Sequence, residues 1–262
     1  MKNSTIFQKI KYYKKSILTK LLIAIIWFFI WEIIYRFVNK EILIVSPFDV
    51  FKNLIFKLFQ KEYWITCFYS IYRIMIGYIL GIFFGIITAI ISYKYKFIYE
   101  FLYPFFNILK STPVVSFIII ALVWIKTENV PIFIVFIMVI PIIWTNIYQG
   151  ILEINNKYYD YFELASIFEF KFLKKMKYIY SKNIFSYVLS SFTVSLGLAW
   201  KSGIAAEVIS SPKISIGSYI YDSKIYLETL DLFTWTITVI IISFILEIFI
   251  KSLLYFIFNI KK

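Results

Sequence analysis

The fold of this chain is decided by residues 66–92, which read TCFYSIYRIMIGYILGIFFGIITAIIS. A helix needs roughly 20 mainly apolar residues to cross the hydrocarbon of a bilayer, because each residue rises about 1.5 Å along the helix axis. This stretch is longer than that and holds one charged side chain, Arg73. A closed barrel would show short alternating strands of about ten residues instead of one continuous run. The stretch therefore predicts a transmembrane helix.

Five other apolar segments repeat this pattern along the chain. Hydrophobic residues make up 61% of the 262 residues and charged residues only 16%, which is more apolar than a soluble protein of this size. The sequence predicts an all-α, polytopic membrane protein with six transmembrane helices, in which a short segment, 1–16, precedes one transmembrane domain, 17–262. The six predicted spans run from Ile17 to Val38, Thr66 to Ser92, Phe101 to Ile125, Pro131 to Gly150, Phe185 to Ile209 and Leu232 to Phe258.

The basic residues indicate how these spans are oriented. More than half of the 28 Lys and Arg residues fall in residues 1–20, 93–100, 151–183 and the tail from Lys251. Lys and Arg accumulate in short cytoplasmic loops, so we expect a cytoplasmic N-terminus in a multi-pass protein of the plasma or inner membrane. The same asymmetry accounts for the net charge of +13, and nucleic-acid binding is therefore not favoured.

The residue inventory disfavours an enzyme. The chain has no histidine and one cysteine, Cys67, which excludes histidine-based triads, histidine metal sites and cysteine clusters. No G-x-x-x-x-G-K-[ST] stretch occurs, so a phosphate-binding loop for ATP is absent. We expect no catalytic residue, no metal and no cofactor. A secondary transporter is a further alternative, but residues 1–130 and 131–262 lack the correspondence of two repeated halves.

Two irregular features accompany the spans. Residues 39–63 carry apolar side chains at helical spacing after Ser46 and Asp49, either of which caps a helix, and predict an amphipathic helix at the outer surface. In the third span, Pro113 predicts a kink or an opened turn, because proline removes a backbone hydrogen bond and clashes with the preceding turn.

Three glycines form a stripe on the second span. Gly77, Gly81 and Gly85 recur every four residues and use three of the seven glycines of the chain. In lipid, such a stripe lets two helix backbones approach closely. It predicts a helix-packing seam, with a contact between subunits as the alternative.

The fifth span carries the candidate pathway residues. Its small residues share one face of the helix and predict either tight packing or the border of an aqueous route. Lys201 and Glu207 lie on the same span, and ionisable groups at membrane depth are costly enough to indicate function. We predict that Lys201, Glu207, Ser195 and Ser202 are pathway-lining or buried polar residues, with Glu32 or Glu247 as possible partners of Lys201. The small residues are Ser191, Ser195, Ala199, Ser202 and Ala206.

Several motifs resemble one transporter family. Four parts of the chain look like the permease subunit of an ABC importer. They are Arg73-Ile-Met-Ile-Gly77, the stretch from Leu109-Lys-Ser-Thr-Pro113 to Leu122-Val-Trp124, the loop from Glu163, and above all Gly197-Leu-Ala-Trp200-Lys-Ser-Gly-Ile-Ala-Ala206-Glu207-Val followed by Ser215-Ile-Gly217. The most similar branch is the nitrate, sulfonate and taurine type. The resemblance runs from about Arg73 to Glu247 and implies the fold of a type I ABC importer permease.

The resemblance also implies a coupling element in the loop 151–183. In this family the loop carries a motif E-A-A, then a glycine, then I-x-L-P, which seats in a groove of the ATPase subunit. Here Glu163, Ala165 and Ile179 match, and the resemblance assigns ATPase coupling to Glu163, Ala165, Ser166 and Phe168. Four motif positions differ, namely Leu164, Glu169, Ser181 and Lys182. The alternative is a basic loop lying on the anionic inner leaflet through Lys171, Lys174, Lys175 and Lys177.

The function implied by the resemblance is solute import. The chain would act as a homodimer, with ATP hydrolysis on separate ABC ATPase subunits and a solute-binding protein outside the cell. The implied substrate is a small anion such as a sulfonate or a nitrate-like compound. Relatives that carry a thiamine-precursor pyrimidine or another small organic solute leave that alternative open.

Overall fold

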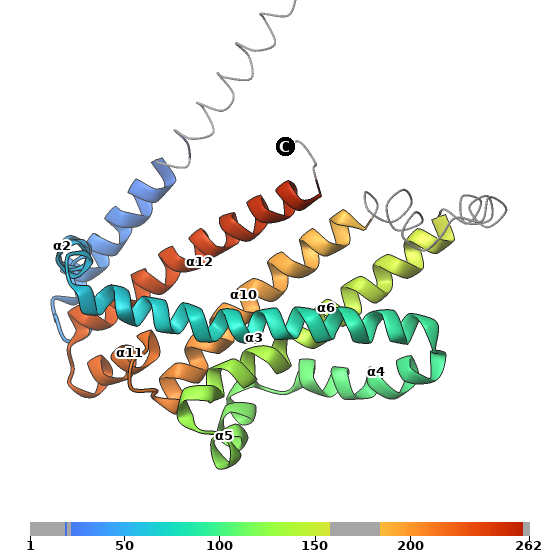
Figure 1. The fold of residues 1–262 in the computed structure, drawn as a ribbon. Coiled ribbons are helices and arrows are strands. Elements are labelled where there is room, and N and C mark those ends of the chain that lie inside the picture. Colours follow the sequence, from blue (N-terminus) through green and yellow to red (C-terminus); the bar gives the residue numbers. More distant parts are fainter. Residues whose placement is uncertain (1–18, 20–21, 158–183, 259–262) are drawn as a thin grey trace, which may run out of the picture.

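The computed structural model describes residues 19, 22–157 and 184–258, which form helices joined by short connections (Figure 1). No β-strand occurs in these ranges. The first helix covers residues 22–38, and the all-α prediction is confirmed. The following elements are α2 (Pro47–Leu58), α3 (Lys61–Lys94), α4 (Lys96–Ser111), α5 (Val114–Trp124), the 3-10 turn η1 (Thr127–Asn129), α6 (Val130–Lys157), α10 (Phe185–Ser210), α11 (Ile216–Ile225) and α12 (Thr229–Ile257).

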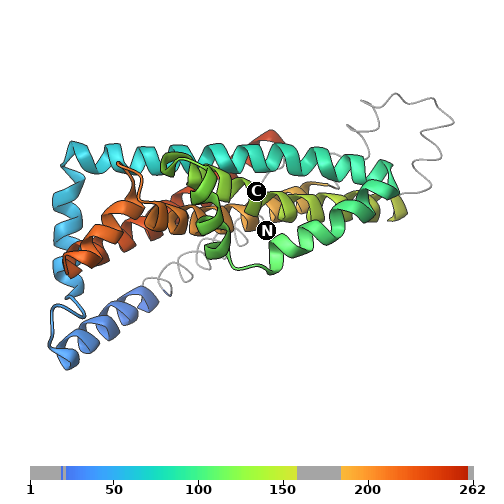
Figure 2. The same ribbon diagram turned by 90° about the horizontal axis from the view of Figure 1, so that it is seen from below.

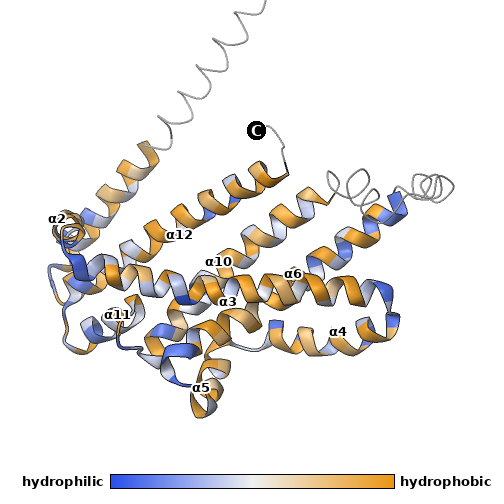
Figure 3. Cartoon of the chain, viewed as in Figure 1, coloured by the Kyte–Doolittle hydropathy of each residue, from blue (hydrophilic) through white to orange (hydrophobic). Residues whose placement is uncertain are grey.

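Four of the described helices are long and apolar enough to cross a membrane. They contain α3, α6, α10 and α12, and the bent pair of α4 and α5 makes a fifth if it counts as one span. The described helix at 22–38 belongs to the first predicted span and is not among the four. Hydrophobic residues dominate along the helices, and hydrophilic residues gather at their ends and in the connections (Figure 3). This distribution is typical of a membrane bundle.

The third predicted span is broken rather than kinked. α4 and α5 make an angle of 103° at the break between them, so no straight helix covers Phe101 to Ile125. Thr112 at the break is extended, with φ −83° and ψ 135°. This is the conformation that a residue before proline prefers, because Pro113 disfavours the helical region for it. Proline therefore ends the first helix, and α5 turns away from the direction of α4 (Figure 2).

The amphipathic helix predicted after the first span is present as α2. Ser46 caps it, because its Oγ accepts a hydrogen bond from the backbone N–H of Phe48 at 3.2 Å. Two residues of this helix, Val50 and Leu54, are buried. On the same face of α2, Lys57 forms an ion pair with Asp231 of α12 at 2.8 Å. α2 is thereby fixed against the start of α12.

The helix α11 was not predicted from the sequence. α11 is ten residues long, and its N-cap is Ser215, whose Oγ accepts a hydrogen bond from the N–H of Ser218 at 3.0 Å. So short an element shows too few turns for a periodic pattern to stand out. α11 packs against α10 and α12. It lies at the end of the bundle where α10 ends and α6 begins (Figure 1). We call this end of the bundle the far end.

Candidate functional site

The glycine stripe of α3 faces α6. A Cβ atom added at Gly81 would lie 2.6 Å from the Cβ of Val139, and one at Gly85 would lie 2.7 Å from the Cβ of Ile143. At Gly77 the added atom would clash with the backbone carbonyl of Ile132. Only glycine permits this approach of the two backbones, and α3 with α6 makes the most extensive helix pair in the described chain.

α10 lies between α6 and α12 in the bundle (Figure 1). Its small-residue face is turned inward, and each of the five small residues named from the sequence is buried. The hydroxyls of Ser195 and Ser202 donate to carbonyls of their own helix, those of Phe192 and Ala199, both at 3.3 Å. Backbone carbonyls thus accept both hydroxyls, and close packing accounts for this face. The five residues are Ser191, Ser195, Ala199, Ser202 and Ala206.

The opposite face of α10 is uncovered. Ser190, Val194 and Lys201 are exposed, and a Cβ atom added at Gly197 would meet no atom within 4 Å. These four positions follow one another at spacings of four, three and four residues, so they line one side of the helix. We call this stripe the open face. Lys201 is the charged residue of the open face.

Glu207 is placed quite differently from Lys201. Its side chain is fully buried, and its Oε2 accepts hydrogen bonds from Ser70 Oγ at 2.7 Å and from the backbone N–H of Gly217 at 3.2 Å. Its Oε1 lies 3.6 Å from Nη1 of Arg73. The carboxylate therefore joins α10 to α3 and to the first turn of α11.

Arg73 is a site residue that the sequence analysis did not single out for this role. Its Nη2 lies 2.5 Å from Oε2 of Glu128 in η1, and its Nη1 donates to the carbonyl of Ile214 at 2.7 Å. Being the single charge within residues 66–92, it carried a signal in the sequence. Its partners lie 55 or more residues away, and spacing along a helix gives no means of finding them.

The two carboxylates considered as partners of Lys201 pair elsewhere. Glu32 forms an ion pair with Arg36 at 2.7 Å and accepts a hydrogen bond from Ser46 at 3.2 Å. Glu247 pairs with Lys251 at 2.5 Å, one turn further along α12. Among the described residues, Lys201 takes part in no ion pair. The partnered alternative for Lys201 thus finds no carboxylate in this part of the chain.

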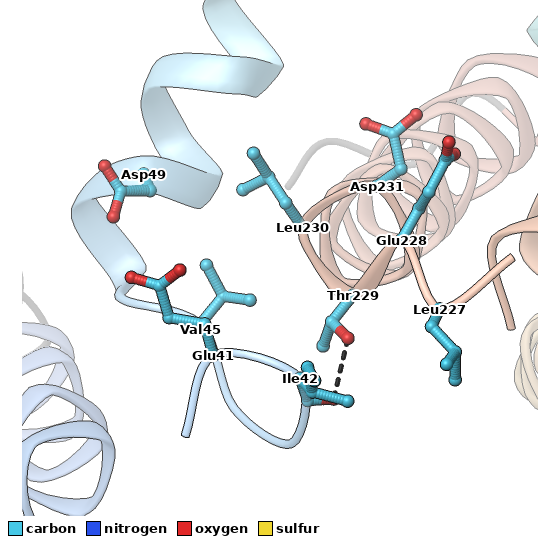
Figure 4. A pocket seen from close by; sticks show the side chains of 9 residues that line it. All are labelled: Glu41, Ile42, Val45, Asp49, Leu227, Glu228, Thr229, Leu230 and Asp231. Atoms are coloured by element: carbon cyan, nitrogen blue, oxygen red, sulfur yellow. Dashed lines mark hydrogen bonds between the residues drawn. The ribbon is translucent and has the colours of Figure 1, made fainter. Parts of the chain in front are cut away.

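An acidic cavity of about 600 Å³ opens between the start of α2 and the start of α12 (Figure 4). Its walls carry the carboxylates of Glu41, Asp49, Glu228 and Asp231. Thr229 closes one side by donating a hydrogen bond to the carbonyl of Ile42 at 2.7 Å. In the described residues, no group of three or more His, Cys, Asp or Glu side chains is placed to hold a metal ion.

The predicted coupling residues lie outside the described residues. Glu163, Ala165, Ser166 and Phe168 fall within 158–183, between the end of α6 and the start of α10. The two helices that flank this segment are in contact, because Gly150 of α6 packs against the ring of Tyr187 in α10. The end of α6 and the start of α10 therefore lie at the end of the bundle opposite to α11 (Figure 1).

The sequence matches the model of one known protein family. The family model described as "Binding-protein-dependent transport system inner membrane component" matches residues 81–260. This match spans more than half of the chain, and the chain belongs to that family. This family consists of inner-membrane components of binding-protein-dependent transport systems, and the described helices that are long and apolar enough to cross a membrane fit this class.

The chain is also similar to individual proteins over part of its length. The chain is 29% identical over 120 residues to a protein of Synechocystis sp. named "Bicarbonate transport system permease protein CmpB", covering 45% of this chain and 41% of the relative. It is 28% identical over 120 residues to a protein of the same name from Synechococcus elongatus, covering 45% and 42%. The chain thus matches less than half the length of these relatives.

Proposed function

We propose that two copies of this chain form a pathway for a small anion, with the open faces of their α10 helices turned toward one another. The observation that carries this proposal is the placement of Lys201. An ammonium group near the middle of a span costs roughly 2.5 to 3.5 kcal/mol when it faces lipid. An aqueous route between two copies removes this cost, and a homodimer supplies such a route by symmetry.

The nature of the substrate follows from the charge of that route. Two copies bring two Lys201 side chains to the pathway, and among the described residues of the open face no carboxylate offsets them. Such a pathway favours an anion over a cation or a neutral solute. The names of the cyanobacterial relatives refer to bicarbonate, a small oxyanion, which supports this class. Within it we propose a sulfonate-like, nitrate-like or bicarbonate-like substrate.

Energy and delivery are assigned to other subunits. ABC ATPase subunits would bind on the cytoplasmic side at residues 151–183 through Glu163, Ala165, Ser166 and Phe168. A solute-binding protein would dock at the far end, on the outside, and the N-terminus would lie in the cytoplasm. ATP binding would then shift the permease between two states that open to opposite sides.

Uptake by a reconstituted complex tests this proposal. Proteoliposomes with this permease, its ATPase subunit and its binding protein are expected to take up labelled bicarbonate, nitrate or taurine only when ATP is supplied. A neutral aminopyrimidine is the competitor that separates the alternatives. Competition by the pyrimidine with no uptake of any anion would overturn the anion assignment. Uptake driven by an ion gradient without the ATPase would indicate a secondary transporter.

A substitution in the loop 151–183 tests the proposed coupling between the permease and the ATPase subunit. Ala165→Arg places a long charged side chain where close docking to the ATPase is proposed, so the ATPase should no longer co-purify with the permease. Ala165→Ser, which keeps the residue small, serves as the control and should leave the complex intact. A normal complex with Ala165→Arg would place the coupling contact elsewhere in residues 151–183.

A further inference from the structure

We propose that Arg73 is a positioning residue for transport, which closes the far end of the pathway through a permanent contact with Glu207 and a releasable contact with Glu128. The three side chains come from α3, α10 and η1 and meet at the connection 211–215 between α10 and α11. We call them the far-end latch. The inference rests on the proposed function, because a latch matters only if the far end opens during transport.

The permanent half of the latch is buried. The side chain of Glu207 is fully buried and that of Arg73 is only 9% exposed. Ser70 donates to Glu207 and also accepts a hydrogen bond from the backbone N–H of Ile216 at 2.8 Å. In the described chain Oε1 of Glu207 accepts no hydrogen bond, so Arg73 alone balances its charge on that side. Separating the two would strand a buried charge, and this contact is therefore expected to persist.

The releasable half is in contact with solvent. The side chain of Glu128 is 42% exposed. Its Oε2 lies 2.5 Å from Arg73, and its Oε1 accepts a hydrogen bond from the backbone N–H of Lys213 at 3.0 Å. Water reaches the half-exposed carboxylate when it dissociates, and Arg73 keeps Glu207 and the carbonyl of Ile214 as partners. Glu128 is thus the residue of the far-end latch that is expected to dissociate from its partners.

Release of Glu128 would have a definite direction. Glu128 belongs to η1, which links α5 to α6, whereas Lys213 and Ile214 belong to the connection between α10 and α11. Once Glu128 lets go, η1 and the 211–215 connection are free to part. α11 stays on α10, because Glu207 still binds the N–H of Gly217. Release would therefore let α10 and α11 move together away from η1, and this movement would widen the far end of the route between the two copies without dissociation of α11.

The latch is tested by the reactivity of a cysteine next to the connection. Ser210 is only 5% exposed and directly precedes residues 211–215. In full-length Cys67→Ser protein held in lipid nanodiscs, Ser210→Cys is reacted with a membrane-impermeant thiol reagent. Glu128→Ala should raise the reaction rate about fivefold, which is the worth of a partly exposed ion pair. Glu128→Gln should give an intermediate rate. Asp222→Ala, which removes an exposed carboxylate of α11, is the matched control and should leave the rate unchanged.

Transport supplies the second readout. In the reconstituted complex, Glu128→Ala should lower the uptake per ATP hydrolysed about fivefold while the amount of assembled complex stays the same. An unchanged labelling rate, or a loss of complex with unchanged uptake per ATP, would overturn the positioning role. Neither result touches the proposed function, which fails separately if the unmodified permease shows no ATP-dependent uptake. The labelling rates decide the latch in that case as well.

Discussion

The two faces of α10 differ in how each holds a charged residue. On the inward face, Glu207 is fully buried and is bound by Ser70, Gly217 and Arg73. On the open face, Lys201 is exposed and takes part in no ion pair of the described chain. Two charges only six residues apart on one helix thus have opposite surroundings. Burial with partners indicates a structural charge, and exposure within a membrane bundle indicates one that meets water or a ligand.

Their opposite surroundings lead to opposite effects of mutation. Removing a buried partner leaves the other charge stranded, whereas removing an exposed and unpaired charge relieves a cost. Each experiment below changes one face and uses the other face as its control.

The largest difference is expected between Glu207→Leu and Lys201→Met. Glu207→Leu leaves Arg73 without its buried partner and should destabilise the protein by about 3 kcal/mol or more. Lys201→Met should leave stability unchanged or raise it. Thermal unfolding in detergent, followed by the amount of monodisperse protein, measures both. Equal stability of the two variants would show that the faces do not differ as described.

A second pair of variants compares the packing of the two faces. A Cβ atom at Gly203 would lie 2.6 Å from Cγ1 of Ile74, whereas one at Gly197 would meet nothing within 4 Å. Gly203→Ala should therefore cost about 1 to 3 kcal/mol relative to Gly197→Ala through overpacking. Both variants gain the same helix propensity, which cancels in the comparison. A Gly197→Ala protein as unstable as Gly203→Ala would mean that the open face is covered.

The smallest effect is expected from a single hydrogen bond at the inward face. The hydroxyl of Tyr78 in α3 donates to the carbonyl of Phe192 in α10 at 2.8 Å. Tyr78→Phe removes this bond and should lower the free energy of unfolding by about 1 kcal/mol. Ser190→Ala on the open face is the control and should change it by less. A larger loss with Ser190→Ala would reverse the assignment of the faces.

The helices were predictable from the sequence because their signal is local. Apolar runs of about 20 residues predicted that α3, α6, α10 and α12 exist, although α3 begins five residues before its predicted span and α6 ends seven residues after its predicted span. The glycine spacing indicated a seam on α3, although only the structure identifies α6 as its partner. The break at Pro113 was expected as an interruption, but its 103° angle depends on packing around α5.

The pairing of the charged residues could not be predicted from the sequence. In the sequence, Lys201 and Glu207 are each a charged residue within an apolar segment, and helical spacing alone does not tell which side chain points inward. Glu207 is buried against Ser70 and Arg73, and both of these partners belong to another span, more than a hundred residues earlier in the sequence. Arg73 and Glu128 meet only after three helices pack together, and such long-range pairs leave no local pattern.

Uptake by Lys201→Met tests the central claim, that the open face of α10 lines an anion pathway, most directly. Uptake is measured per assembled complex in proteoliposomes, with Lys201→Arg as the variant that keeps the charge. Lys201→Met should assemble as well as the parent and lose about tenfold in uptake, the effect of one lost charge-assisted contact, while Lys201→Arg should retain most of it. Uptake per complex that is unchanged by Lys201→Met would contradict the account and remove the open face from the pathway.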